Sequence, residues 1–446
     1  ISLKCCGMEE KKVFDYTKAQ WMTLIVCYCI YFVFGGIESS QGVYYSVMKK
    51  ELAIPYNVQG FLVSMTSWSF ILTSPIIGYG MSFTDVKPIV IAGFVSYLCA
   101  YSSLLALRQL WCVFISLFVE GMGGVLLDVG INTLSTVIFT SHRGVMMNYL
   151  HFFYGLGSVL GPLYSSWFMG MMHFGYRGAF VGLLIFCVIG FVMAVFSRLS
   201  LKQNAVLDDS KDVEESLTVA EVPKEESSVV IPAEKESLTV ADGSKEDPNA
   251  VLVPAKKESL TVWKSFITPM VWLLGLNMGA VCAIESITVN WAPLYLQYLY
   301  HIDPTSGGAR FISLFYVFYT AARLVTGFVV DYFGDELSMI LFNLLLIVWY
   351  GIAFALGRNG VWLLTFSGFF ISPLYPTALS TAMHVFGSEA KNTVSTILCL
   401  SYVVSLVIQV IIGYVNEFIN PAWGYPILSV IASSVIILCM SVARLW

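Results

Sequence analysis

The sequence predicts an all-α membrane protein with twelve transmembrane helices arranged as two six-helix halves. The 446 residues are 57% hydrophobic and 12% charged, which is about half the charged fraction of an ordinary soluble domain. The charges are clustered and leave apolar runs of about 20 residues, the length that spans a bilayer as a helix. Six such runs precede a long polar segment and six follow it.

The predicted spans define four parts of the chain. We expect a cytoplasmic N-terminal segment at 1–18, an N-terminal six-helix half at 19–198, a linker at 199–262 and a C-terminal six-helix half at 263–446. The individual spans are expected near residues 19–47, 56–82, 88–107, 110–138, 144–172, 177–198, 264–298, 308–332, 337–357, 360–386, 392–416 and 422–443.

The linker differs in composition from both halves. It is rich in Lys, Glu, Asp, Ser, Pro and Val, has almost no aromatic residues, and repeats the motif ESLTV at 215–219, 236–240 and 258–262. Too little apolar surface is available to offset the entropy cost of ordering, so we expect a disordered tether between the halves. Partner binding or phosphorylation at its Ser and Thr residues is the alternative role.

Deletion of residues 208–254 from the linker is expected to leave folding and transport near normal. The linker residues that remain, at about 3.3 Å each, still reach from one half to the other. Solute flux through the purified deletion protein, compared with the intact chain, measures this. Loss of flux in a correctly inserted protein would instead make the segment a working part.

Loop charges orient the chain. Lys and Arg in the short loops are more numerous on the side that holds both termini and the linker, which predicts that this side is cytoplasmic. The sequence contains no nucleotide-binding loop, catalytic triad or metal-ligand spacing, so we expect neither an enzyme nor a nucleic-acid-binding protein. We expect a monomer in the plasma membrane, with no cofactor other than a coupling ion.

Short matches relate the two halves. Ile37-Glu38-Ser39 in the first span recurs as Ile284-Glu285-Ser286 in the seventh, and Gly121 in the fourth span corresponds to Gly368 in the tenth at the same offset. Several matches in corresponding spans indicate duplicated halves. That organisation is typical of transporters whose site lies between the repeats near the membrane midplane.

Carboxylates inside apolar spans are the first functional candidates. Asp128 and Asn132 are four residues apart in the fourth span and therefore share one helix face. A carboxylate in an apolar helix costs several kcal/mol and usually faces the interior of the bundle, where it functions. Glu38 and Glu285 complete the predicted coupling set, and a purely structural carboxylate bonded to Asn132 is the alternative for Asp128. Glu120, in the outer third of its span, is expected to snorkel toward the interface.

Amides, hydroxyls and aromatic rings in the spans suit a sugar, because hydroxyls take paired hydrogen bonds and a pyranose face stacks on an aromatic ring. The substrate-binding candidates are Gln41, Asn132, Asn148, His151, Tyr154, Asn290, Trp291, Ser372 and Tyr375. For His151 and Trp291 the alternative is an ordinary packed side chain. A buried carboxylate can exchange a proton when a gate admits water, or its oxygens can hold Na⁺, and both coupling ions remain open.

A loop motif carries a resemblance to a known family. The segment that contains Arg323, Gly327, Asp331 and Gly334 resembles the cytoplasmic motif of the major facilitator superfamily between its eighth and ninth spans. The resemblance implies a gate in which the Asp and Arg hold the outward-open state. Asp85 stands in the degenerate counterpart of this motif in the first half.

The fourth, fifth and tenth spans resemble one group within that superfamily. Asp128-x-x-x-Asn132, then residues 150–157 and the Ser372-Pro-Leu-Tyr375-Pro-Thr segment, are similar to the fucose–galactose–glucose:proton symporters and their animal sodium-dependent glucose transporter relatives. The resemblance implies symport, with Glu38 and Asp128 at the acid positions of the first and fourth spans. In both places the acid identity is swapped between Asp and Glu.

These observations predict a proton- or sodium-coupled symporter of a monosaccharide or a similar polar organic solute. A uniporter or exporter of another solute is the alternative within transport, because Gly157-x-x-x-Gly161-Pro162 resembles a motif frequent in antiporters. A transport-silent sensor or scaffold that signals through the linker is the alternative from another class.

Overall fold

A computed structural model describes residues 18–81, 83–138, 143–200, 267–386 and 390–445. Nearly all of the predicted N-terminal segment and of the predicted linker, including the ESLTV repeats, lies outside these residues.

Helices form the first half of the described chain, and each begins and ends within a few residues of a predicted span. They are α1 (Lys18–Glu51), α2 (Tyr56–Gly80), α3 (Val86–Ala106), α4 (Leu110–Ile138), α5 (Arg143–Met172) and α6 (Tyr176–Phe196).

The second half is helical as well but more broken. Its elements are α9 (Pro269–Tyr300), η1 (Pro304–Gly308), α10 (Ala309–Ala322), α11 (Thr326–Phe333), α12 (Asp335–Ala355), η2 (Gly357–Gly360), α13 (Val361–Leu364), α14 (Ser367–Ile371), α15 (Leu374–Phe386), α16 (Ala390–Phe418) and α17 (Gly424–Ala443).

The membrane-spanning character of these helices follows from their length and composition. Among the described residues, nine helices are long and apolar enough to cross a membrane, and a tenth is added when α10 and α11 count as one bent span. The all-helical membrane fold is therefore confirmed, while length and composition alone account for nine or ten of the twelve expected spans.

Two predicted spans are not continuous helices, and the expectation of an unbroken helix was wrong there. The eighth, 308–332, consists of α10 and α11 bent by 50°. The tenth, 360–386, is divided into α13, α14 and α15. Pro373 lies at the second of the breaks in the tenth span, where the missing N–H and the ring of proline interrupt a helix.

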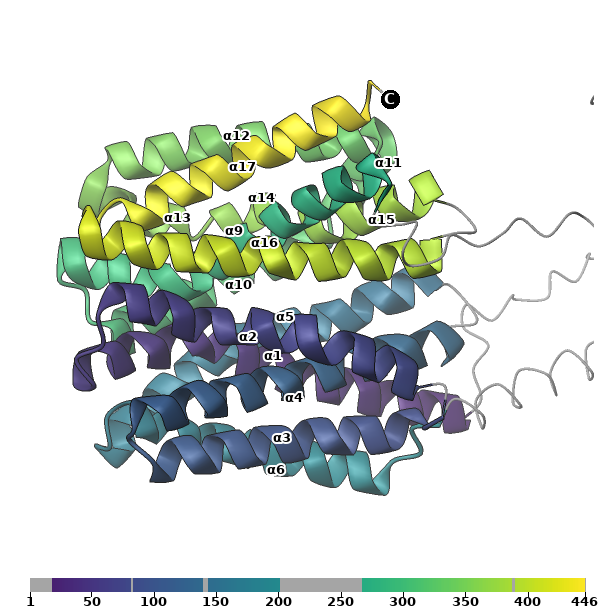
Figure 1. Ribbon diagram of the computed structural model, residues 1–446, viewed down its shortest axis with the longest axis horizontal. Helices are drawn as coiled ribbons and strands as arrows, with labels where there is room; N and C mark the ends of the chain where they lie inside the picture. The colour runs from purple at the N-terminus through teal and green to yellow at the C-terminus, as the bar shows by residue number, and fades with distance from the viewer. Residues whose placement is uncertain (1–17, 82, 139–142, 201–266, 387–389, 446) are drawn as a thin grey trace, which may run out of the picture.

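The two halves lie side by side (Figure 1), with α1 to α6 below and α9 to α17 above in this view. They meet where α2 packs on α16, where α5 packs on α10 and where α1 packs on α9. We call the end at which α1 stops and α2 begins the α1–α2 end, and the opposite end, where α6 stops and α9 begins, the linker end.

Glycines allow the closest helix approaches. A Cβ at Gly157 would overlap the carbonyl of Phe32 in α1, and a Cβ at Gly155 would overlap Thr320 in α10. These glycines of α5 thus allow it to pack closely against α1 and α10. Between the halves, a Cβ at Gly42 of α1 would overlap the carbonyl oxygen of Val289 in α9.

A polar contact joins the halves at the α1–α2 end. The backbone N–H of Tyr56, at the start of α2, donates to Oε2 of Glu417 in α16 at 2.7 Å. Lys49 Nζ lies 3.6 Å from the centre of the Tyr56 ring. Glu417 of the second half thus accepts a hydrogen bond at the electropositive start of a helix of the first half, and it interacts electrostatically with Lys49.

Replacing Glu417 by Ala is expected to open the α1–α2 end about two- to fivefold more often, because an exposed charged contact of this kind contributes about 0.5–1 kcal/mol. Spin-label distances between the outer ends of α1 and α9 report the opening. Glu51→Ala is the matched control: Glu51 Oε1 also accepts a backbone N–H, from Tyr176 at 3.2 Å, but both residues belong to the first half. Equal opening in the two variants would show that Glu417 has no latch role.

Candidate functional site

Asp128 lies in a compact group of predicted site residues. Its Oδ1 accepts hydrogen bonds from Tyr31 Oη and from Asn132 Nδ2, both at 2.9 Å. The Tyr31 ring makes edge contacts with the rings of His151 and Tyr154. The structure therefore brings α1, α4 and α5 together around one partly exposed carboxylate.

Glu38, a residue of α1, lies against α4. Its Oε1 accepts from Tyr97 Oη of α3 at 3.1 Å. In α4, a Cβ at Gly124 would lie 3.1 Å from the same oxygen. The small residue leaves room for a carboxylate from α1 against the backbone of α4.

Glu120 does not snorkel, and that prediction was wrong. Its side chain has 0% exposed surface. Its Oε1 accepts from Tyr44 at 2.7 Å, Tyr101 at 2.8 Å and Gln41 at 3.4 Å. The donors come from α1 and α3, and their hydrogen bonds direct the Glu120 carboxylate toward the interior of the bundle. A usable sequence signal was the spacing of four that links Glu120, Gly124 and Asp128 on one face of the span.

Glu285 is the corresponding carboxylate of the second half. Its oxygens accept from Tyr316 at 3.1 Å and Tyr319 at 3.0 Å, both of α10. Arg323 donates to the Tyr319 hydroxyl at 3.1 Å, and its guanidinium lies 5.0 Å from the ring centre. Tyr319 thus connects the carboxylate to a cation at the end of α10.

The carboxylates of the two halves are close enough to act on one another. Glu38 interacts electrostatically with Glu285, and Asp128 with Tyr375 of α15. Asp128, Glu38 and Glu285 all keep partial exposure, whereas Glu120 has none. The three partly exposed acids therefore keep accessible surface that Glu120 lacks.

Other predicted substrate residues take different positions. Gln41 donates to Glu120, and the fully buried Trp291 donates from Nε1 to Oε1 of Gln409 at 2.5 Å. Asn290 Oδ1 and Ser372 Oγ are buried and lack a hydrogen-bond partner among the described residues. Nothing is described for the side chain of Asn148.

The predicted gating residues are not paired with one another in this conformation. Arg323 bonds Tyr319, and the side chain of Asp331 is exposed on α11. A Cβ at Gly327 would meet nothing within 4 Å. Asp85 caps α3 by accepting the Val86 N–H at 2.8 Å and also accepts from Ser200 Oγ at 2.6 Å.

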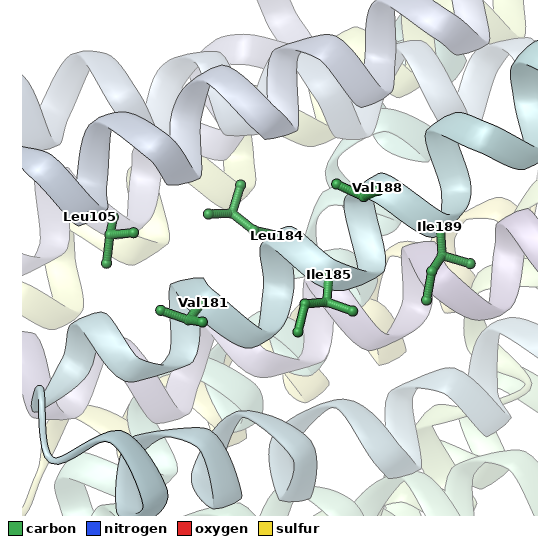
Figure 2. Close-up of a pocket in the computed structure, with 6 residues that line it drawn as sticks. All are labelled: Leu105, Val181, Leu184, Ile185, Val188 and Ile189. Carbon is green, nitrogen blue, oxygen red and sulfur yellow. The ribbon is translucent and has the colours of Figure 1, made fainter.

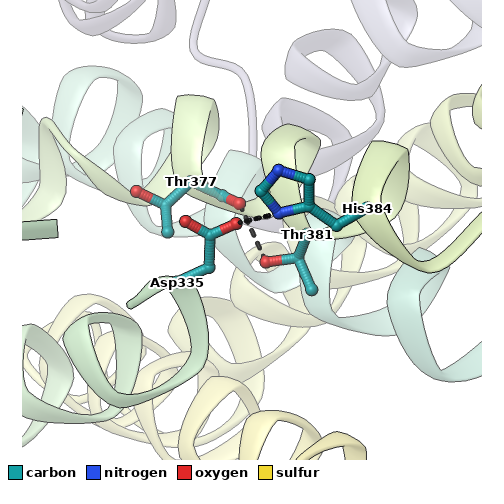
Figure 3. Close-up of polar contacts among 4 residues, drawn as sticks. All are labelled: Asp335, Thr377, Thr381 and His384. Carbon is teal, nitrogen blue, oxygen red and sulfur yellow. Dashed lines mark hydrogen bonds and ion pairs between the residues drawn. The ribbon is translucent and has the colours of Figure 1, made fainter. Parts of the chain in front are cut away.

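A further polar contact at the linker end involves Asp335 at the start of α12 and His384 near the end of α15. His384 Nδ1 lies 3.2 Å from Asp335 Oδ2, and the histidine side chain is 78% exposed (Figure 3). Nearby, Thr381 Oγ1 donates to the Thr377 carbonyl within α15. The exposure of His384 makes this a surface contact of small energetic weight.

An apolar groove between α3 and α6 is not a candidate solute site. Leu105 of α3 lines it together with residues of α6 (Figure 2). The lining residues of α6 are Val181, Leu184, Ile185, Val188 and Ile189. It offers no hydrogen-bonding group, so it fits a lipid chain better than a polar solute.

The described residues contain no group of three His, Cys, Asp or Glu side chains that could hold a metal ion. The carboxylates Asp128 and Glu38 belong to one helical half and Glu285 to the other, and a chain of two helical halves is an organisation typical of membrane transporters. The sequence profile of the Major Facilitator Superfamily matches residues 27–402. The chain belongs to this superfamily and is one of its transporters.

Solved structures support the same fold. The chain is similar to a D-xylose–proton symporter, with 12% identity over 94% of this chain and 97% of that one and a TM-score of 0.66. It is also similar to the nucleoside transporter NupG, with 11% identity, coverage of 96% and 99% and a TM-score of 0.68. A POT family transporter bound to 5-aminolevulinic acid gives 14% identity, coverage of 98% and 97% and a TM-score of 0.66. No curated protein matches the chain.

Proposed function

We propose that this transporter is a proton- or sodium-coupled symporter of a monosaccharide or a similar polar organic solute, working by alternating access. The observation that carries the proposal is the set of partly exposed carboxylates at Asp128, Glu38 and Glu285. Each accepts a hydrogen bond from at least one tyrosine hydroxyl, and together they come from both halves.

The carboxylates have two roles in this proposal. Asp128 binds and releases the coupling ion, and Glu38 and Glu285 interact with both the ion and the solute. Tyr31 holds Asp128 in place by a hydrogen bond, and Tyr319 does the same for Glu285. A carboxylate that binds its ion in one conformation and releases it in the other couples the gradient to the movement of the halves.

The solute is proposed to bind beside these acids. Asn132, His151, Tyr154 and Tyr375 supply amide, imidazole and hydroxyl groups together with aromatic faces, the combination that suits a sugar ring. Asn290 and Ser372 add buried polar atoms that lack a partner among the described residues. A hydroxyl-rich solute would satisfy such atoms, which an apolar solute would leave unpaired.

The gates are proposed to alternate. With a cytoplasmic linker the α1–α2 end faces outward, and α1 packs on α9 through Gly42 and Val289, in the part of each helix nearer that end. Asp331 and Arg323 would pair in the opposite, outward-open state by a charge-assisted hydrogen bond. We place the protein in the plasma membrane as a monomer, with both termini in the cytoplasm.

A solute-uptake panel in proteoliposomes with imposed pH and Na⁺ gradients tests the proposal. Accumulation of a monosaccharide driven by one of the gradients is the expected result. Flux that only equilibrates the solute would indicate a uniporter, and flux opposed to the ion gradient would indicate an exporter. A correctly folded protein that moves none of the solutes, yet signals through its linker, would favour a sensor.

A further inference from the structure

Glu120 lies in a polar cluster of its own. It precedes Asp128 by eight residues in α4, which at 1.5 Å per residue places it about 12 Å nearer the α1–α2 end. Its Oε1 accepts from Tyr44, Tyr101 and Gln41, whereas the partners of Asp128 are Tyr31 and Asn132. The two carboxylates of α4 therefore share no hydrogen-bond donor.

No cation is found around Glu120 among the residues that the structure describes. The titratable groups that act on it are Glu38, Tyr44 and Tyr45 from α1, Tyr97 and Tyr101 from α3, and Cys187 from α6. From α2, the contacts at neighbouring Gly121 are Ser69 and Thr66, neither of which titrates. Every titratable neighbour is an acid, and Glu120 forms no ion pair with any described residue.

The lack of a cation decides the charge of the buried group. A carboxylate anion taken out of water without a counter-charge costs several kcal/mol, and the neutral acid avoids most of that cost. The three donors to Oε1 offset part of it. They do not cancel it, because the second oxygen is buried as well.

The two oxygens of Glu120 differ in a way that locates a proton. Oε1 accepts all three hydrogen bonds, while Oε2 is buried and has no partner among the described residues. A neutral carboxyl group has one carbonyl oxygen, which accepts, and one hydroxyl oxygen, which carries the proton. Oε1 fits the carbonyl oxygen, which leaves Oε2 for the proton.

We propose that Glu120 is a proton-binding site separate from Asp128, occupied in this conformation and reached from the α1–α2 end. Gln41 and Tyr44, two of its donors, flank Gly42, the residue that seats α1 on α9. When α1 and α9 separate, water reaches the turn of α1 that contains Gln41, Gly42 and Tyr44. A water molecule then accepts the proton of Glu120, and the three hydrogen-bond donors stabilise the carboxylate that remains. The existence of this proton-binding site does not depend on the proposed symport, but a role for the site in a coupled transport cycle rests on that function.

Infrared spectroscopy of the purified protein in lipid vesicles, without solute and at neutral pH, tests the site. Among the protein's own groups, only carboxyl groups held neutral by their surroundings show a C=O stretching band above the amide bands, and the lipid ester band is common to all samples and cancels in the difference between variants. Glu120→Gln is expected to lose one such band that Asp128→Asn retains. Glu336→Gln, in the first turn of α12, is the control and should leave the spectrum unchanged. Because no flux is measured, a failure of the proposed function would not alter the result.

A second variant keeps the test decisive if Glu120→Gln does not fold. Tyr101→Phe removes one donor to Oε1 and keeps the ring, which stacks between Tyr97 and Phe180. The carbonyl of Glu120 then loses a hydrogen bond, and its band should move to higher frequency. The proposal is overturned if the Glu120→Gln spectrum equals the wild-type spectrum. With that variant unfolded, an unchanged Tyr101→Phe spectrum overturns it.

Discussion

Asp128→Asn is expected to abolish uphill accumulation of the solute while exchange between equal pools survives. The amide mimics a permanently protonated carboxyl group, so the ion gradient no longer drives the movement of the halves. Both hydrogen bonds to Asp128, from Tyr31 and Asn132, go to Oδ1. The amide oxygen accepts the same two bonds, so the fold should remain intact. Counterflow and gradient-driven uptake in the same vesicles measure the two activities.

The structural alternative for Asp128 predicts a different pattern. A carboxylate that only holds Tyr31 and Asn132 in place would, once replaced, lower thermal stability and reduce exchange and uphill uptake together. Glu38→Gln should differ from both patterns, because replacing a residue that contacts the solute weakens solute binding itself. If Asp128→Asn still accumulates solute with the wild-type ion dependence, the coupling role passes to Glu38 or Glu285.

The helices of the first half were predictable because each span is a long apolar run closed by polar turns. The placement of Asp128, Glu38 and Glu285 inside the bundle was predictable for a related reason, since a charge inside such a run is costly in lipid and therefore usually faces the interior. The duplication of the Ile-Glu-Ser motif placed two of them in corresponding spans. These features can be read from short stretches of the sequence, and their meaning does not depend on which helices pack together.

Glu120 shows what local signals miss. Its depth in the span suggested an interfacial side chain, but its direction is set by Tyr44 and Tyr101, which lie 76 and 19 residues away along the chain. A sequence indicates neither which hydroxyls of other helices reach a carboxylate nor how many do. The same limit applies to Trp291, whose indole N–H donates to Gln409, a residue 118 positions further along the chain.

The gate shows a second limit. A motif selected for two conformations cannot reveal which contact one conformation uses. Arg323 was expected beside Asp331, and in this conformation it bonds Tyr319 instead. One residue can serve both states, since the side chain of Arg323 can exchange a tyrosine for a carboxylate when α10 and α11 move.

Gly42→Ala is expected to stop transport and leave the fold intact, because the added Cβ overlaps the carbonyl oxygen of Val289 across the two halves. Overpacking costs about 1–3 kcal/mol, which depletes the closed state by a factor of roughly 5 to 150. Alanine favours helix more than glycine, so α1 itself is not weakened. A cysteine at Asn290, buried in α9, should label faster from outside. Gly170→Ala, where nothing lies within 4 Å, is the control. Wild-type labelling and flux in Gly42→Ala would show that α1 and α9 do not form the outer gate.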